Sequence, residues 1–441
     1  MTVTARETES VLPSAAEAAA DEEVRAEEVQ VQAQEDQKQA VLEHRPAPPA
    51  VPSGPGRART ELKREIELDF IRGIAILLVL DYHAPIGVML YPFKLMGFPH
   101  FGWVGVDIFF VLSGFLVGGL LIKEWKVRGR IDSKRFLIRR GFKIWPQYYV
   151  FLGLNLVTGH RRPMSLLGNF LNVQNYVRGS IPHTWSLAVE EHAYLLLVLC
   201  LAVAARRKTR MRNLFLFLAA TTAFVFVMRL VLINKGYNVF PWTHTRIDGI
   251  IYGVMLAILY HYVPDTFHKV QNWTWLWLAT LACALLYFRF FNALVPWELS
   301  LSWDFGSATG IALIMLLYKH REGRVRPWAY RFVAFIGLYS YGIYLWHIAV
   351  RDPLGKFAMR LPHWISPTAL AVLPIVGGIL MGMFFTKLVE FPTLKLRDRL
   401  FPRRIYSPVG VPAEILEHKA HHTPPAADAT GPLVLPAAPS V

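Results

Sequence analysis

The sequence predicts an all-α membrane protein of about ten spanning helices, with a disordered tail at each end. Hydrophobic residues make up 54% of the 441 residues and charged residues only 18%, which leaves too little polar surface for a water-soluble globule. Apolar runs near the roughly 20 residues that cross a bilayer recur along the chain. Lys and Arg gather in alternate loops between those runs, as they do in polytopic membrane proteins.

Composition divides the chain into three parts. Residues 1–62 are rich in Ala, Glu, Gln and Pro, with an acidic segment and a Pro-rich linker, so we expect a disordered tail there. Residues 63–400 contain the apolar runs and form the predicted membrane domain. Residues 401–441 are rich in Pro and Ala and predict a second disordered tail.

The apolar runs give the predicted helices in order. Their ranges are roughly 67–90, 101–122, 142–159, 184–204, 213–233, 244–262, 273–291, 299–318, 332–350 and 369–391. Basic residues concentrate in the loops after the second, fourth and eighth runs and beyond the last run. The positive-inside rule therefore places both termini in the cytoplasm. We expect an integral protein of a bacterial inner (plasma) membrane, surrounded by membrane lipid.

Charge and cysteine content exclude two other kinds of site. The net charge of +15 reports membrane orientation in such a chain, so we predict no nucleic-acid partner. Cys200 and Cys283 both lie in apolar runs and offer neither a disulfide framework nor a metal cluster. We therefore predict no bound metal.

The first apolar run carries Arg72 near its start and His83 near its end. They lie eleven residues apart, which places them on almost the same face of a helix, about 16 Å apart along its axis. Either residue alone could be an interfacial anchor or cap. Because ionisable groups within a span usually face a protein interior, both on one face favour a shared pocket.

The second and fourth runs add further polar residues. Asp107 shares a face with Gly114 and Gly118, which predicts close approach of another helix and leaves Asp107 either as a satisfied packing residue or in a site. In the fourth run, polar residues again share one helical face; they are His183, Glu190 and Tyr194, with Ser186 close by. A carboxylate near an imidazole suits acid–base catalysis, although a helix that enters a membrane often begins with such residues.

Three more segments are candidates. Arg140 and Lys143 lead into the third run, where they could clamp a phosphate or simply anchor the helix on the cytoplasmic side. Arg246 and Asp248 could form an ion pair at the start of the sixth run. His347 ends an aromatic-rich stretch of the ninth run, where interfacial anchoring is the simpler interpretation.

Together, these segments resemble motifs of the acyltransferase family 3 of integral membrane acyltransferases. The matching segments are Arg72-Gly73 followed by His83, then 105–115, 185–191, 340–347 and Glu390-Phe391-Pro392. The resemblance covers about 66–395, and the order of several motifs makes it specific.

The resemblance implies ten spanning helices and transfer of acyl groups, often acetyl, to hydroxyls of sugars, envelope glycans or secondary metabolites. It implies that Arg72 and His83 are the family's essential arginine and histidine. The family's cytoplasmic Arg-x-x-Arg motif, tied to the use of acyl-CoA, falls on Arg140 and Lys143, where lysine replaces the second arginine. The usual Phe before the tyrosine of the fourth-run motif is Ala193 here.

The expected donor is therefore acyl-CoA, most simply acetyl-CoA, bound from the cytoplasm with its phosphates near Arg140, Lys143 and Arg72. We expect His83 to act as general base on the acceptor hydroxyl and Glu190 to orient it, with a covalent acyl-histidine as a variant. The rival interpretation is a proton-coupled transporter or flippase of a glycolipid or metabolite. Carriers often contain internal repeats, and the two halves of this chain show no convincing one. A non-catalytic membrane sensor is a third reading. The acceptor and the oligomeric state stay open.

Overall fold

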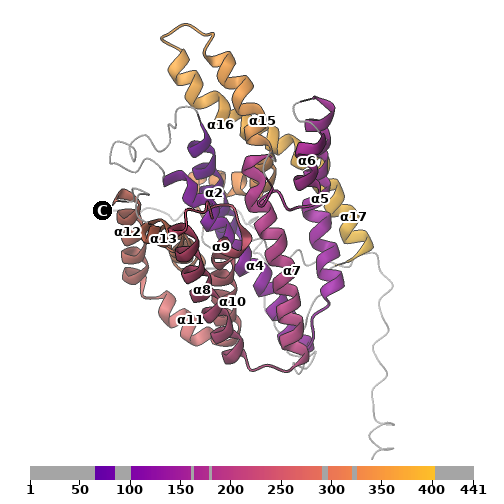
Figure 1. Ribbon diagram of the computed structural model, residues 1–441, viewed down its shortest axis with the longest axis vertical. Coiled ribbons are helices and arrows are strands. Elements are labelled where there is room, and N and C mark those ends of the chain that lie inside the picture. The colour runs from indigo at the N-terminus through magenta and orange to yellow at the C-terminus, as the bar shows by residue number, and fades with distance from the viewer. Residues whose placement is uncertain are drawn as a thin grey trace, which may run out of the picture. The chain divides into compact units, whose positions relative to one another are not determined.

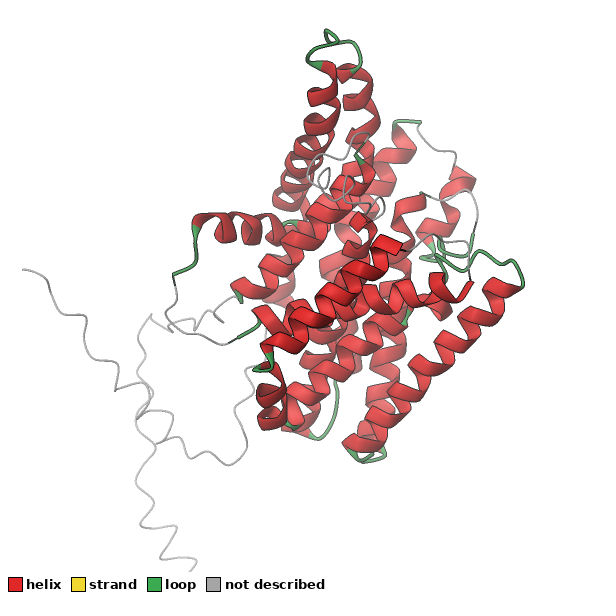
Figure 2. Ribbon diagram, turned by 90° about the vertical axis from the view of Figure 1, so that its left-hand side faces the viewer, coloured by secondary structure: helices red, strands yellow, loops and turns green. Residues whose placement is uncertain are grey.

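The computed structural model describes residues 65–84, 101–159, 163–177, 181–290, 296–319 and 325–402. Every regular element in those ranges is helical, which confirms the all-α prediction (Figure 2). The predicted tail at 1–62 and nearly all of 401–441 lie outside the described residues, so their disorder stays a prediction.

Figure 1 shows the described helices, coloured in chain order. In order they are α2 (Ile66–His83), η1 (Phe101–Trp103), α4 (Val104–Arg128), α5 (Ser133–Val157), α6 (Pro163–Phe170), η2 (Pro182–Thr184), α7 (Trp185–Arg206), α8 (Met211–Asn234), α9 (Thr243–Arg246), α10 (Asp248–Tyr262), α11 (Pro264–Gln271), α12 (Thr274–Phe290), α13 (Pro296–Leu317), α14 (Trp328–Leu338), α15 (Ser340–Ala358), α16 (Ser366–Phe385), the π-helical η3 (Thr386–Glu390) and α17 (Phe391–Leu400).

Fewer helices meet the length and composition of a membrane span than the sequence predicted. Five do so among the described residues, namely Val104–Arg128, Pro182–Arg206, Met211–Asn234, Trp297–Leu317 and Ser366–Leu400. The count rises to seven if two bent pairs each make one span: α10 with α11, bent by 114°, and α14 with α15, bent by 75°. Ten spanning helices are therefore not confirmed.

The difference has a physical cause in the helices that do not qualify. The described part of the range 67–90 is α2, which carries Glu67, Asp69, Arg72 and Asp81, while α5 begins with a strongly basic segment. The apolar part of α12, Thr274–Tyr287, is shorter than a span. Charges thus lower the hydropathy of two predicted helices, and those charges include several of the candidate site residues.

Two glycines bring α4 and α10 into backbone contact. A Cβ on Gly114 would overlap the carbonyl oxygen of Ile250, and a Cβ on Gly253 would overlap that of Val111. Gly118 faces Val254 one turn further along. The predicted close approach of a helix to this face of the second run is therefore confirmed, and α10 is that helix.

The remaining helices place polar residues next to one another. The hairpin partners α15 and α16 run side by side (Figure 1), and α15 also packs against α2 and α5. The first part of α7 lies against α4 and α5. The polar faces of α2, α4, α5, α7 and α15 therefore point at a shared interior, which is where the candidate site lies.

Candidate active site

Two histidines from different helices face each other at the end of α2. The ring centroids of His83 and His347 are 5.0 Å apart. The Nδ1 atom of His83 lies 2.9 Å from the carbonyl oxygen of Val79, and that of His347 lies 2.7 Å from the carbonyl oxygen of Tyr344. Because a carbonyl can only accept a hydrogen bond, each Nδ1 carries a proton, and in the neutral ring the lone pair is therefore on Nε2. The two rings are therefore both in the tautomer of a base.

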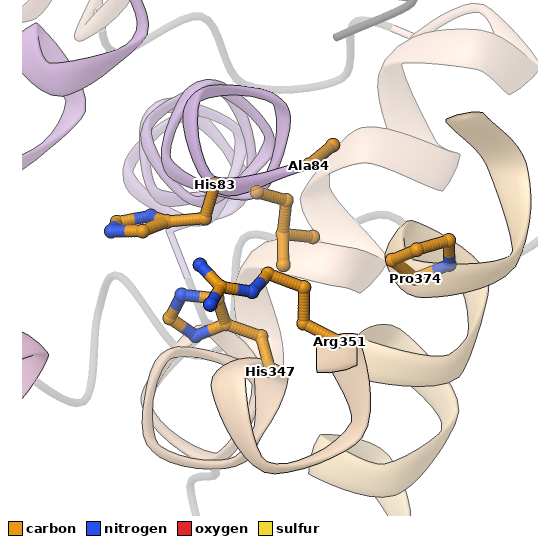
Figure 3. Close-up of a pocket in the computed structure, with 6 residues that line it drawn as sticks. His83, Ala84, His347, Arg351 and Pro374 are labelled. Atoms are coloured by element: carbon orange, nitrogen blue, oxygen red, sulfur yellow. The ribbon is translucent and has the colours of Figure 1, made fainter. Parts of the chain in front are cut away.

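These histidines line a small pocket, which we call the histidine pocket (Figure 3). Its lining residues are Leu80, His83, Ala84, His347, Arg351 and Pro374, which come from the end of α2, from α15 and from α16. His347 is only 2% exposed, and its Nε2 has no hydrogen-bond partner among the described residues. The sequence interpretation missed Arg351, although it follows His347 by one helical turn and so lies on the same face.

His183 of η2 and Ser186 at the start of α7 contact the same region. The His183 ring lies 5.4 Å from that of His347, centroid to centroid. The Tyr344 hydroxyl donates a hydrogen bond to the His183 carbonyl oxygen at 2.6 Å and accepts one from the Ser186 hydroxyl at 2.5 Å. His183 and Ser186 therefore fix α15, and with it His347, against α7.

Glu190 lies further along α7 and has different partners. Its carboxylate accepts hydrogen bonds from Ser113 at 2.9 Å and from Tyr194 at 3.0 Å, and it lies 4.0 Å from the Arg140 guanidinium. Arg140 also hydrogen-bonds the Tyr194 hydroxyl and lies over its ring, 4.2 Å from the centroid. Glu190 and Tyr194 share a face of α7 as predicted, whereas His183 lies in η2, seven residues and about 10 Å before Glu190. Among the described residues, Glu190 therefore contacts Arg140 and not His83, contrary to the expected pairing.

Three cations from α2 and α5 lie near Glu190 and form what we call the basic entrance: Arg72, Arg140 and Lys143. Lys143 pairs with Glu390 of η3 at 3.1 Å, and Arg72 pairs with Asp69 at 3.0 Å. Arg72 is also close enough for its charge to act on Lys143 and Glu190. The side chains of the three cations keep exposed fractions of 31%, 20% and 36%. They could therefore still reach an anionic ligand.

A second ionic group, which we call the ionic brace, comprises Arg229, Arg246, Asp107, Asp248 and Asp304. Arg246 pairs with Asp107 of α4 at 2.5 Å, and Arg229 pairs with Asp248 at 2.7 Å and Asp304 at 2.6 Å. The expected ion pair between Arg246 and Asp248 is therefore wrong, because each residue pairs with a different helix. The sequence interpretation missed Arg229, which is fully buried. A lone arginine within an apolar run was the signal that could have identified it.

The described residues contain no group of three or more His, Cys, Asp or Glu side chains arranged to hold a metal ion. The functional groups in this region include imidazoles, a carboxylate-supported arginine and the hydroxyls of Ser113, Ser186, Tyr194 and Tyr344.

Comparison with known proteins adds a family and a set of named relatives. A family model described as an acyltransferase domain matches residues 65–387. The peptidoglycan O-acetyltransferase OatA of Listeria monocytogenes is 24% identical over 314 residues, which cover 64% of this chain and 49% of that protein. A putative O-acetyltransferase of Staphylococcus aureus is 28% identical over 314 residues, covering 64% of this chain and 50% of its own length.

A third relative gives longer coverage of this chain. The putative peptidoglycan O-acetyltransferase YrhL of Bacillus subtilis is 25% identical over 376 residues, covering 77% of this chain and 56% of that protein. The chain thus spans about half the length of the curated relatives it matches. No solved structure matches the chain.

Proposed function

The chain belongs to the acyltransferase family, and we propose that it is a membrane O-acyltransferase that moves an acyl group from acyl-CoA to an acceptor hydroxyl. Acetyl is the proposed acyl group, because the reported relatives are named O-acetyltransferases. The acceptor class is a sugar, an envelope glycan or a secondary metabolite. Two of the relatives are named as a peptidoglycan O-acetyltransferase and a putative one, which favours an envelope glycan as the acceptor.

The observation that carries this proposal is the histidine pocket, in which the Nδ1 atoms of His83 and His347 lie against backbone carbonyls and leave Nε2 as the basic atom of each neutral ring. Transfer to a hydroxyl requires a group that removes the hydroxyl proton as the oxygen attacks, and a neutral imidazole is suited to that task near neutral pH. His83 lies on the same helix as Arg72, which begins near the basic entrance. One helix therefore joins the proposed donor end to the proposed base.

The proposed reaction uses His83 as general base. Its Nε2 takes the proton of the acceptor hydroxyl while the hydroxyl oxygen bonds to the carbonyl carbon of the thioester. The carbon–sulfur bond then breaks, and the departing thiolate takes the proton from the His83 imidazolium. The products are the acyl ester and CoA, with His83 restored to its neutral form.

The basic entrance is the proposed site for the phosphates of the donor. Arginine forks match phosphate oxygens in pairs, and lysine adds a point charge. Glu190 takes a different role from the expected one: its carboxylate and the Tyr194 hydroxyl position the Arg140 guanidinium. In the proposed orientation both termini are cytoplasmic, so that the entrance faces the compartment that contains acyl-CoA.

The second candidate function is a proton-coupled transporter or flippase. It is favoured by the two bent helix pairs and by the buried ionic brace, since broken helices and intramembrane charges are common in carriers. The two functions differ in one respect that can be measured, because a carrier moves its substrate without changing its covalent structure.

The test is acyl transfer from acetyl-CoA labelled on the acetyl group, in membranes that contain the protein or an empty vector. Extracts of envelope glycans and of secondary metabolites serve as acceptors. The proposal predicts label bound covalently to an acceptor only in membranes with the protein, with release of free CoA. Movement of an unmodified acceptor across the membrane, without covalent label, would support the carrier instead.

A further inference from the structure

Two fully buried polar side chains lie in the seam where α5, α15 and η3 meet. Gln147 and Thr386 are both 0% exposed. The amide nitrogen and oxygen of Gln147 and the hydroxyl of Thr386 have no hydrogen-bond partner among the described residues. Polar groups buried in this way are costly to the folded state unless they are paired, so their presence in an apolar interior requires an explanation.

The two side chains approach each other across a glycine of α15. A Cβ on Gly342 would lie 2.8 Å from the Gln147 amide nitrogen and 2.6 Å from the carbonyl oxygen of Gly382, and it would overlap the Thr386 hydroxyl. Glu390, one turn after Thr386, also has an unpaired carboxylate oxygen, while its other oxygen pairs with Lys143. The unpaired polar atoms of Gln147, Thr386 and Glu390 thus belong to one group in this seam.

All three helical segments of this seam are interrupted close to it. Pro146 lies inside α5, α16 continues into the π-helical η3, and α15 begins after the bend of 75° from α14. Proline and π-helical segments break the regular hydrogen-bond ladder, and π-helical segments occur often at functional sites. A seam of interrupted helices can separate at lower cost than a seam of regular ones.

The seam lies between the two parts of the proposed active site. Along α5, Gln147 follows Lys143 of the basic entrance by one turn. Another turn further, the Phe151 ring lies 6.0 Å from the His183 ring and 5.0 Å from the Trp346 ring, next to His347. An extended ligand that reached from the basic entrance to the histidine pocket along α5 would therefore pass Gln147.

We propose that Gln147 and Thr386 bind the amide groups of the pantetheine arm of acyl-CoA, an inference that rests on the proposed function. Each amide of the arm presents one N–H donor and one carbonyl acceptor. The Gln147 side chain offers both complementary groups, and the Thr386 hydroxyl can donate or accept. The seam binds the uncharged arm, whereas the basic entrance, which is rich in cations, binds the phosphates.

The test compares two ligands that share phosphates and differ in the arm. CoA and adenosine 3′-phosphate 5′-diphosphate, which carries the same three phosphates and lacks the arm, are titrated into the purified full chain by calorimetry. Gln147→Leu and Thr386→Val should each weaken the affinity for CoA by roughly tenfold. The affinity for the ligand without the arm should stay unchanged. Thr222→Val is the matched control: Thr222 is a buried threonine of α8 whose hydroxyl bonds a backbone carbonyl, and its replacement should affect neither ligand.

The outcomes separate this inference from the proposed function. Binding of CoA by the wild type with no loss in either variant would overturn the arm site alone, as would equal losses for both ligands. Binding of neither ligand by the wild type would overturn the proposed donor and the arm site with it. Thr386→Val changes few atoms, so it keeps the test decisive if Gln147→Leu lowers the yield of folded protein.

Discussion

The basic entrance and the part of the ionic brace around Arg229 differ in how completely their cations are paired with other groups. Arg229 of the brace is fully buried, and its three guanidinium nitrogens donate to Asp248, Asp304 and Ser300 and to the carbonyl oxygen of Thr245. In the entrance, Lys143 has one carboxylate partner and an exposed fraction of 36%. A saturated arginine stabilises the fold, whereas a partly exposed cation keeps the capacity to bind a ligand.

The largest effect on activity is expected at the histidine pocket. The loss of transfer there is the reference for the effects of changes in the basic entrance and the ionic brace. His83→Ala should lower acyl transfer by about 10²–10⁴-fold, because it removes the proposed general base, and it should leave the unfolding temperature unchanged. The measurement is transfer from labelled acetyl-CoA at matched protein levels. His363→Ala, at an exposed position between α15 and α16, is the control. Near wild-type transfer by His83→Ala would exclude His83 from the chemistry.

The sharpest test of the brace is Arg229→Met. Removing one partner of a buried ionic group leaves unpaired charges on Asp248 and Asp304, so the fold should be destabilised by about 3–5 kcal/mol. Thermal unfolding in detergent measures this loss, and Arg212→Met, at an exposed position of the same helix, should show none of it. A stable Arg229→Met protein that has lost acyl transfer would show that the brace acts in the reaction. The distinction between a stabilising brace and a ligand-binding entrance would then be wrong.

The entrance should respond in the opposite way. Lys143→Gln is expected to raise the KM for acetyl-CoA by roughly tenfold, about 1.4 kcal/mol. It should lower the unfolding temperature less than Arg229→Met does, because the glutamine amide can still donate a hydrogen bond to the buried Glu390 carboxylate. Lys143→Arg should restore the wild-type KM or lower it, because the guanidinium adds a fork that lysine lacks. Steady-state kinetics with both variants decides the matter. An unchanged KM in Lys143→Gln would remove Lys143 from the donor site.

The smallest effect is expected where hydrogen bonds only hold α15 against α7. Tyr344→Phe removes the hydroxyl that links Ser186 to the His183 carbonyl, so it should cost about 0.5–1.5 kcal/mol of stability and a few-fold in transfer. Tyr149→Phe, which removes a hydroxyl bonded to a backbone carbonyl on the exposed face of α5, is the control for stability. A loss of transfer as large as that of His83→Ala would instead place Tyr344 among the reacting groups.

The sequence was sufficient for the fold class because a simple count of apolar and charged residues determines it. The prediction of ten spans is not confirmed among the described residues, because charges in α2 and α5 and the short apolar part of α12 keep these helices below the length and composition of a span. Helix periodicity also placed residues on shared faces correctly, as at Gly114 and Gly118. Periodicity describes one helix at a time, and which faces meet depends on the packing of the whole molecule.

The candidate site illustrates the same limit. The face that links Glu190 and Tyr194 could be predicted, but Glu190 lies beside Arg140 because α5 approaches that part of α7. Arg246 pairs with Asp107, 139 positions away in sequence, and no local pattern encodes that contact. Gln147 and Thr386 belong to no pattern that the sequence analysis could identify. Their unusual property is that their buried polar atoms have no hydrogen-bond partner among the described residues.

The backbone contact between α4 and α10 has a mechanical consequence. Side chains can change rotamer and let two helices slide, but a contact between main chains at Gly114 and Gly253 offers no such adjustable layer. These two helices therefore cannot slide easily past each other. Relative motion of helices during the reaction has to involve other elements. The irregular backbone of the site lies in other elements, at Pro146 of α5, at the π-helical η3 and at the bend before α15. We therefore expect no relative motion of α4 and α10 during catalysis, and cross-linking α4 to α10 should leave the catalytic cycle intact.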